Sequence, residues 1–141
     1  FTLNTAIYEI NQKNILMNAN DPNNPDLLVQ RGADRSRGFE VDLTGYVFSN
    51  WQITASYSYI DVTIVADAND ALVGERKENT PRHSGNIWTR YNFSNTSVLK
   101  DLGVGLGVQS QGSRIPWFTR AFEVPAFTVL DAALYYTPSK S

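Results

Sequence analysis

The chain of 141 residues contains no cysteine and a single histidine, His83. The absence of cysteine excludes a disulfide framework, a thiolate metal site and a cysteine nucleophile. A lone histidine has no second ligand at useful spacing, so we expect His83 to be structural. Ser84 beside it has no triad or oxyanion-hole context. We therefore predict no catalytic residue, no metal site, no cofactor and no enzymatic activity.

Long apolar runs and clusters of positive charge are also missing. No stretch approaches the roughly 18 consecutive apolar residues of a transmembrane helix, and the mean hydropathy is −0.30, which excludes a helical membrane protein. A membrane β-barrel stays open, because its alternating strands place only half of their residues in lipid. The twelve Lys and Arg residues are scattered and the net charge is −2, which argues against a nucleic-acid partner. No signal-peptide pattern begins the chain, so an export signal would have to precede it.

What the chain does contain is period-two alternation in segments rich in Tyr, Val, Ile, Thr and Phe, which predicts an all-β fold. The segments are about residues 1–16, 38–49, 51–61, 84–93, 102–113 and 126–137. Ser49-Asn50 predicts a tight turn, and therefore a hairpin, between the second and third segments. Strands of roughly 10 to 13 residues exceed the five or six residues usual in soluble sheets and suit a tilted crossing of a bilayer.

The alternation sorts side chains onto two faces. Val41 and Leu43 point away from Glu40 and Asp42, so one face is apolar and the other carries carboxylates. In residues 103–107 every second position is glycine. Because glycine weakens a strand interior, this repetition predicts either a close backbone approach or a face that touches a plug or water.

The connections between strands differ in length from one end to the other. They are short near residues 50 and 95 and long near residues 20, 70 and 120. Outer-membrane barrels separate short periplasmic turns from long extracellular loops in this way, whereas a soluble sandwich has no reason to do so. The acidic loop of residues 67–78 is interpreted as solvated surface.

Seven stretches, taken in order, carry a family resemblance. They are YEINQKNIL at 8–16, DPNNP at 21–25, QRG at 30–32 with RSRGFEVD at 35–42, WQITASYSY at 51–59, TPRHS at 80–84 with WTRY at 88–91, GVGLGV at 103–108 and VPAFTVLDA at 124–132. Each stretch is weak alone, but together they cover nearly the whole chain. The sequence resembles the C-terminal part of the TonB-dependent outer-membrane ferric-siderophore receptors.

The resemblance implies a fragment of a 22-stranded transmembrane β-barrel, with residues 1–141 forming one partial C-terminal barrel domain that lacks the plug domain and the final strands. It implies import of ferric siderophores across the outer membrane of a Gram-negative-type bacterium, driven by TonB acting through the absent plug. Six or seven strands cannot close a barrel of that curvature. We therefore expect an open sheet of long antiparallel meander strands, with edges that pair with other chains and a face in contact with outer-membrane lipid.

One loop combines cationic and aromatic side chains at the expected outer mouth of the barrel. Arg114, Trp117, Phe118 and Arg120 suit an anionic or aromatic iron chelate through charge and cation–π contact, and we predict that they bind ligand. Aromatic residues also form interfacial girdles that bind no ligand. We expect such lipid-facing or interfacial positions for Tyr57, Tyr59, Tyr91, Phe93 and Tyr136.

The carboxylates of Glu40 and Asp42 have more than one explanation. Their spacing would suit an acid–base pair or a hard cation. In a barrel they would face the lumen, and we favour a structural role there. The expected partners are polar plug residues or Arg35, Arg37 and Arg90.

The alternative function is that of a soluble β-sandwich that recognises carbohydrate through exposed aromatics such as Trp88, Trp117 and Tyr135. Such a module should have shorter strands and similar loops at both ends. An all-β hydrolase would need convergent acid–base or nucleophilic groups, and the sequence offers only isolated carboxylates.

Overall fold

In a computed structural model of the protein, six antiparallel strands lie side by side in chain order. The structure describes residues 1–18, 21–67, 69–93, 98–116 and 120–138. The strands are β1 (Thr2–Asn18), β2 (Leu28–Phe48), β3 (Trp51–Ala66), β4 (His83–Asn92), β5 (Leu102–Gln111) and β6 (Phe127–Tyr136), and a short 3₁₀ turn, η1 (Asp70–Leu72), lies between β3 and β4. Within the described ranges no helix is long and apolar enough to cross a membrane.

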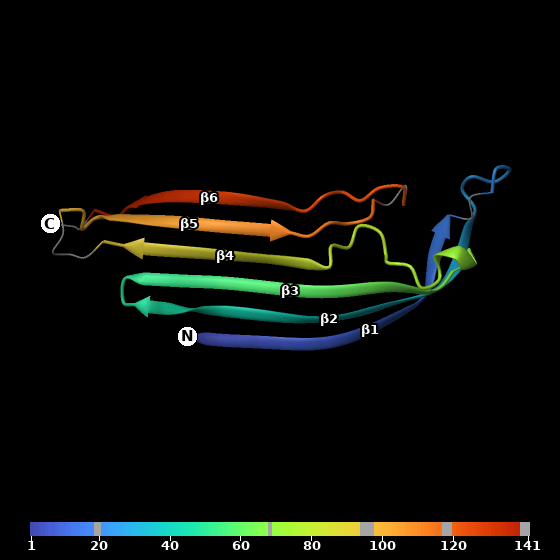
Figure 1. The fold of residues 1–141 in the computed structure, drawn as a ribbon, viewed down its shortest axis with the longest axis horizontal. Coiled ribbons are helices and arrows are strands. Elements are labelled where there is room, and N and C mark those ends of the chain that lie inside the picture. Colours follow the sequence, from blue (N-terminus) through green and yellow to red (C-terminus); the bar gives the residue numbers. More distant parts are fainter. Residues whose placement is uncertain (19–20, 68, 94–97, 117–119, 139–141) are drawn as a thin grey trace.

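Each strand bonds to its neighbours in the sequence, which makes the sheet a meander. Figure 1 shows a single open sheet with β1 and β6 at its edges, in which β1, β2 and β3 run past the end of β4 and curve away. The predicted all-β meander of long strands is confirmed, and so is the open sheet. The described residues form no second sheet, so the two-layer carbohydrate-binding sandwich is not the observed fold.

Two strands are longer than predicted. β2 begins at Leu28 instead of residue 38, and β3 continues to Ala66 instead of residue 61. The added part of β2 pairs with the far end of β1, where Gln30 lies opposite Leu16. These residues show no clear alternation, so their strand conformation depends on the neighbouring strand more than on their own propensity.

The connection between β1 and β2 contains a compact turn at residues 21–24. The Asp21 carboxylate accepts hydrogen bonds from the backbone N–H of Asn23 (2.8 Å) and from the Asn24 side-chain amide (3.4 Å). These bonds, the one from Asn23 foremost, hold the pKa of the Asp21 carboxyl below its usual value. The aspartate therefore stabilises the reversal between the two strands, as Asx turns do.

The register carries the alternation of each strand across the whole sheet. Residues directly opposite each other point to the same side, so rows of like chemistry form. On one side, here called the apolar face, a row runs through Leu3, Leu43, Ala55, Ile87, Val108 and Leu130. On the other side, here called the polar face, the next row runs through Asn4, Asp42, Ser56, Asn86, Gln109 and Val129.

A single open sheet leaves almost no core. Among the described residues Ile64 is the one fully buried large hydrophobic side chain, whereas Ile7, Leu130 and Leu134 are 89%, 76% and 85% exposed. Apolar surface on this scale marks a face that lipid or another protein covers.

The glycines of β5 make room for aromatic rings that lie on the polar face. A Cβ atom added at Gly105 would lie 2.7 Å from Trp88 Cζ2, and one added at Gly107 would lie 2.6 Å from Trp88 Cε3. Carbon atoms do not approach so closely. Of the two explanations that the sequence allowed, close approach is observed, but the approaching group is the Trp88 ring instead of another backbone.

We predict that Gly107→Ala destabilises the sheet by about 1–3 kcal/mol, the usual cost of overpacking, because the new methyl group collides with the Trp88 indole. The free energy of unfolding of the intact protein, from denaturant titration, measures this loss. The same substitution made together with Trp88→Ala is the control and should cost much less. An equal loss in both backgrounds would show that the indole is not the cause.

Candidate functional site

The loop predicted to bind ligand connects β5 to β6. An isolated antiparallel β-bridge between Arg114 and Val124 closes the loop at its base. The backbone N–H of Arg114 donates to the Val124 carbonyl (3.1 Å), and the N–H of Val124 donates back to Arg114 (2.8 Å). Arg114 therefore lies at the base of the loop. Trp117 and Phe118 lie outside the described residues, so their place in the predicted site stays a prediction.

Arg120 lies against the long loop between β3 and β4. Its guanidinium is 3.7 Å from the Glu75 carboxylate and 3.5 Å from that of Glu78. It also donates a hydrogen bond to the backbone carbonyl of Arg76 (2.9 Å). The cation expected to meet an anionic ligand is thus already engaged by two acids of the neighbouring loop.

Two further contacts tie the same loops together. The guanidinium of Arg76 donates to the carbonyls of Thr80 (2.7 Å) in its own loop and Ser113 (2.6 Å) at the end of β5. The backbone N–H of Asn79 donates to the carbonyl of Ile115 (2.8 Å). The described parts of the loops at residues 69–82 and 112–126 are therefore bonded to each other.

The β3–β4 loop is also fixed to the extended part of the sheet. Lys77 Nζ lies 2.7 Å from Asp34 Oδ2, and the Asp34 side chain is only 8% exposed. The other oxygen, Oδ1, is buried and accepts no hydrogen bond from a described residue. Next to this pair the N–H of Lys77 donates to the carbonyl of Val62 (2.8 Å), and the N–H of Ile64 donates to that of Glu75 (2.9 Å).

The interpretation of the acidic loop as solvated surface is therefore wrong for residues 76–78. Arg76, Lys77 and Glu78 are partly buried, and backbone bonds of Glu75 and Lys77 attach this segment to the free edge of β3. The sequence does contain a signal, a pair of cations between two acids at residues 75–78. It does not identify Asp34 as the partner of Lys77, because 43 residues separate them.

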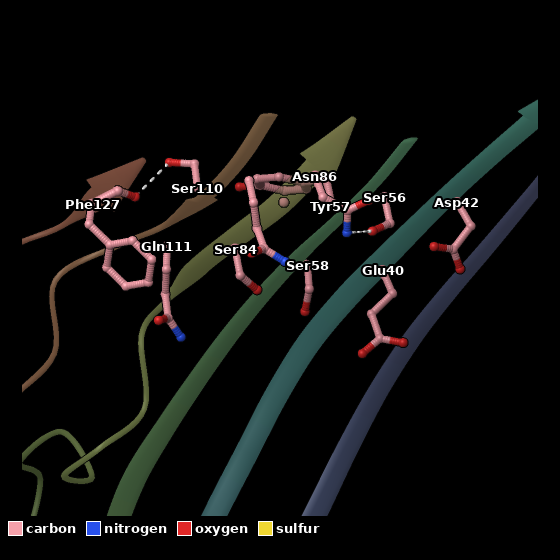
Figure 2. A pocket seen from close by; sticks show the side chains of 12 residues that line it. Glu40, Asp42, Ser56, Tyr57, Ser58, Ser84, Asn86, Ser110, Gln111 and Phe127 are labelled. Atoms are coloured by element: carbon pink, nitrogen blue, oxygen red, sulfur yellow. Dashed lines mark hydrogen bonds between the residues drawn. The ribbon is translucent and has the colours of Figure 1, made fainter. Parts of the chain in front are cut away.

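The polar face carries an open hollow of about 500 Å³ above the middle of β2, β3, β4 and β5. Figure 2 shows Glu40 and Asp42 of β2 on its rim, with serine, asparagine and glutamine side chains of the next strands beside them. Asn86 donates to the Ser56 hydroxyl (2.7 Å) within this group. The predicted sharing of one face by the two carboxylates is confirmed, and the hollow offers hydrogen-bonding groups from several strands.

The expected arginine partners of Glu40 and Asp42 lie elsewhere. Arg37 forms an ion pair with Glu9 (2.6 Å) on the apolar face, and Arg90 lies 4.0 Å from the centre of the Tyr135 ring. Arg35 shares the orientation of Arg37, since the two are two residues apart on one strand. The pairing was wrong because each arginine either has a closer partner or points to the opposite face. In the described ranges no ion pair involves either carboxylate.

His83 contacts two tyrosines on the apolar face. Its Nδ1 lies 2.8 Å from the Tyr57 hydroxyl, and its ring centre is 5.1 Å from that of Tyr59. Among the described residues no cluster of His, Cys, Asp or Glu could hold a metal ion.

Comparison with known proteins decides the family. All of residues 1–141 match the family described as TonB dependent receptor-like, beta-barrel. The chain belongs to this family. Within it, the metal-pseudopaline receptor CntO of Pseudomonas aeruginosa (strain UCBPP-PA14) is 32% identical over 132 residues, which are 93% of this chain and 18% of that receptor. The ferrichrome outer membrane transporter/phage receptor of Escherichia coli (strain K12) is 28% identical over 131 residues, 93% of this chain and 17% of that protein.

Solved structures of such receptors share the fold. The siderophore receptor PiuA from Acinetobacter baumannii superimposes with a TM-score of 0.74 at 24% identity, covering 98% of this chain and 20% of that one. The ferripyoverdine receptor of Pseudomonas aeruginosa, bound to ferripyoverdine, superimposes with a TM-score of 0.72 at 21% identity, covering 97% and 19%. The chain spans about a fifth of the length of these proteins. The sheet is open because it corresponds to one stretch of a TonB-dependent receptor barrel.

We predict that Lys77→Met lowers the free energy of local opening of the β3–β4 loop in the intact receptor by about 3 kcal/mol. The substitution leaves the buried Asp34 carboxylate without a counter-charge. Hydrogen exchange of the backbone amides of residues 74–77 reports on this loosening and should become faster. Adding Asp34→Asn should restore most of the protection, since the amide carries no charge. Unchanged exchange in Lys77→Met, or no rescue by the second substitution, would contradict this account of the ion pair.

Proposed function

We propose that this chain is part of the wall and outer loops of a receptor that binds ferric siderophores and imports them by TonB-dependent active transport. The observation that carries the proposal is the family match over residues 1–141, together with relatives that are named as siderophore and metal receptors. In this proposal, the plug domain and the remaining strands belong to the parent protein, and TonB acts through the plug. The chain has no enzymatic role, in keeping with a family of receptors.

The two faces of the sheet support a place in the outer membrane of a Gram-negative-type bacterium. Aromatic side chains border the apolar face at two levels, one near the short turns and one toward the long loops. The first level holds Phe48, Trp51, Tyr91 and Phe93, and the second holds Phe39, Tyr57, Tyr59 and His83. From Trp51 to Tyr59 the strand runs about 27 Å at ~3.4 Å per residue, and a tilt of about 40° leaves roughly 21 Å along the membrane normal, comparable with the ~25 Å apolar band of such barrels.

The polar face then lines the lumen. Glu40 and Asp42, which have no ion pair in the described part of the chain, present negative charge and hydrogen-bond acceptors beside the hollow. A plug domain with complementary polar groups would cover them, because a buried carboxylate without a partner is costly. This is the structural role that we assign to the two acids.

We assign ligand binding to Arg114, Trp117, Phe118 and Arg120 at the mouth. The argument rests on the chemistry of cationic and aromatic side chains and on the position of the loop at the end with long connections. Arg120 forms ion pairs with Glu75 and Glu78. An anionic chelate that binds Arg120 must therefore compete with these two carboxylates for its guanidinium.

Iron uptake tests the transport proposal directly. Cells that lack other siderophore receptors and produce the full-length receptor should accumulate ⁵⁵Fe from at least one of ferrichrome, a ferric catecholate and ferripyoverdine. The uptake should vanish when TonB is deleted, since the energy arrives through TonB. Cells without the receptor are the control. Failure of all three chelates to enter above that control would count against siderophore import.

Substitutions in the loops test the ligand site. We predict that Arg120→Ala weakens binding of the transported chelate about tenfold, as expected for the loss of a charge-assisted contact worth ~1.4 kcal/mol. The double substitution Glu75→Gln/Glu78→Gln should instead tighten binding, because it frees the guanidinium. Lys100→Ala, which removes one charge at the opposite end of the sheet, is the matched control. Titration of the purified receptor gives each Kd, and a double variant that binds no better than wild type would show that Arg120 does not touch the chelate.

A further inference from the structure

A series of alternating charges, here called the charge cluster, links the extended part of β2 to the loop between β5 and β6. The ammonium group of Lys77 lies 2.7 Å from the Asp34 carboxylate and 3.8 Å from that of Glu78. The Arg120 guanidinium lies 3.5 Å from Glu78 and 3.7 Å from Glu75. Three acids therefore surround two cations, and the charge cluster carries one surplus negative charge.

The acids of the charge cluster differ in their access to a ligand. The side chain of Asp34 is 8% exposed, whereas those of Glu75 and Glu78 are 55% and 21% exposed. The Arg120 side chain between the two glutamates is 28% exposed. A ligand that reaches the guanidinium therefore meets both glutamates at the same time.

The lumen wall beside the charge cluster offers no further cation. From Glu40 toward the long loops, the next two rows of the polar face run through Tyr8, Gly38 and Ile60 and through Ile10, Ser36 and Val62. Between Lys77 at the loop end and Arg90 near the short turns, the described polar face carries acids and no cation. A polyanionic ligand therefore gains no compensating attraction from this wall.

The base of the β5–β6 loop leaves the balance of charge as it is. Arg114 forms no ion pair with a described acid. Glu123 lies in the same loop and accepts a hydrogen bond from the Ser113 hydroxyl (2.6 Å). These two residues contribute one charge of each sign.

The repulsion by the two glutamates grows with the negative charge of the ligand. A ligand oxygen that accepts a hydrogen bond from Arg120 lies about 6 Å from both carboxylates, since a hydrogen bond adds about 3 Å to the ion-pair distances. Two like unit charges about 6 Å apart in water lower an affinity roughly threefold, and salt screens part of this effect. For a ligand with three negative charges the loss over both glutamates is about tenfold after screening. A neutral ligand experiences none of this repulsion.

We propose that Glu75 and Glu78 are specificity determinants that restrict the loop site to ferric chelates that are neutral or carry a single negative charge. Arg120 donates hydrogen bonds to an oxygen of the chelate, while the glutamates hold the guanidinium in place and repel polyanions. A ferric tris-hydroxamate is neutral, since its singly charged hydroxamates balance Fe³⁺, and it belongs to the accepted class. A ferric tris-catecholate is a trianion, since each catecholate is doubly charged, and it belongs to the excluded class. The inference rests on the proposed function, because it requires these loops to bind a ferric chelate.

Titration of the purified full-length receptor with ferrichrome, a neutral tris-hydroxamate, and with a trianionic ferric tris-catecholate tests the inference. We expect the wild-type receptor to bind ferrichrome at least about tenfold more tightly. Glu75→Gln/Glu78→Gln should narrow the ratio of the two Kd values about tenfold, since it removes both repelling charges. It should tighten the binding of ferrichrome itself by less than about threefold. Because both Kd values come from the same variant, a change in the amount of folded receptor cancels in their ratio.

Asp26→Asn/Asp70→Asn is the matched control, because it removes two acids of the long loops that form no ion pair with Arg120. Its ratio of Kd values should stay within about twofold of the wild-type ratio, since salt screens distant charges. A wild-type receptor that binds the tris-catecholate as tightly as ferrichrome would overturn the inference. So would a ratio that Glu75→Gln/Glu78→Gln leaves unchanged, or that the control narrows equally.

All of these outcomes leave the transport proposal intact. Transport itself fails when none of the chelates of the uptake assay enters cells through the wild-type receptor. The two proposals therefore fail separately.

Discussion

The continuous ladder of hydrogen bonds between consecutive strands is the constraint on which the rest of this structure depends. Five antiparallel pairings in chain order join β1 to β6, and the register is unbroken over the middle of the sheet. Because direct partners share a face, one register fixes the side of every residue at once. A slip of one residue in any pairing would move leucines into the polar hollow and carboxylates onto the apolar face.

The ladder also explains why the loops behave differently from a solvated surface. β1, β2 and β3 are longer than β4, so β3 has a free edge above the point where β4 begins. The unpaired N–H and C=O groups of such an edge need hydrogen-bond partners. Residues 75–77 supply them, and the side chains of Arg76, Lys77 and Arg120 then connect this segment to Asp34 and to the next loop. Backbone hydrogen bonds of the kind that join the strands therefore also hold the β3–β4 loop in place at the long-loop end of the sheet.

The sequence predicts most of the strands and the face on which their side chains lie. It predicts few of the contacts between the loops. β3 and β5 are recognisable because alternation and turn residues agree with each other there. The start of β2 is not recognisable, because its polar residues become a strand only by pairing with β1. Glu40 and Asp42 face the side that alternation predicts. The prediction that they pair with Arg37 or Arg90 was wrong, because Arg37 pairs with Glu9 and Arg90 lies over the Tyr135 ring. The alternating glycines predicted either a close backbone approach or a face that touches a plug or water, and the structure shows that the group packed against them is the Trp88 ring, which the glycine spacing alone could not identify.

The bonding of the β3–β4 loop divides it into two parts with different tolerance for change. The tip around η1 is exposed and closes mostly on itself, through the bond from the Ala71 N–H to the Asn69 side chain and that from Glu75 to Leu72. Residues 75–80 bond to the sheet and to the next loop. Inserted peptides or surface tags are therefore accommodated at the tip, whereas the same insertions four or five residues later would break the sheet edge.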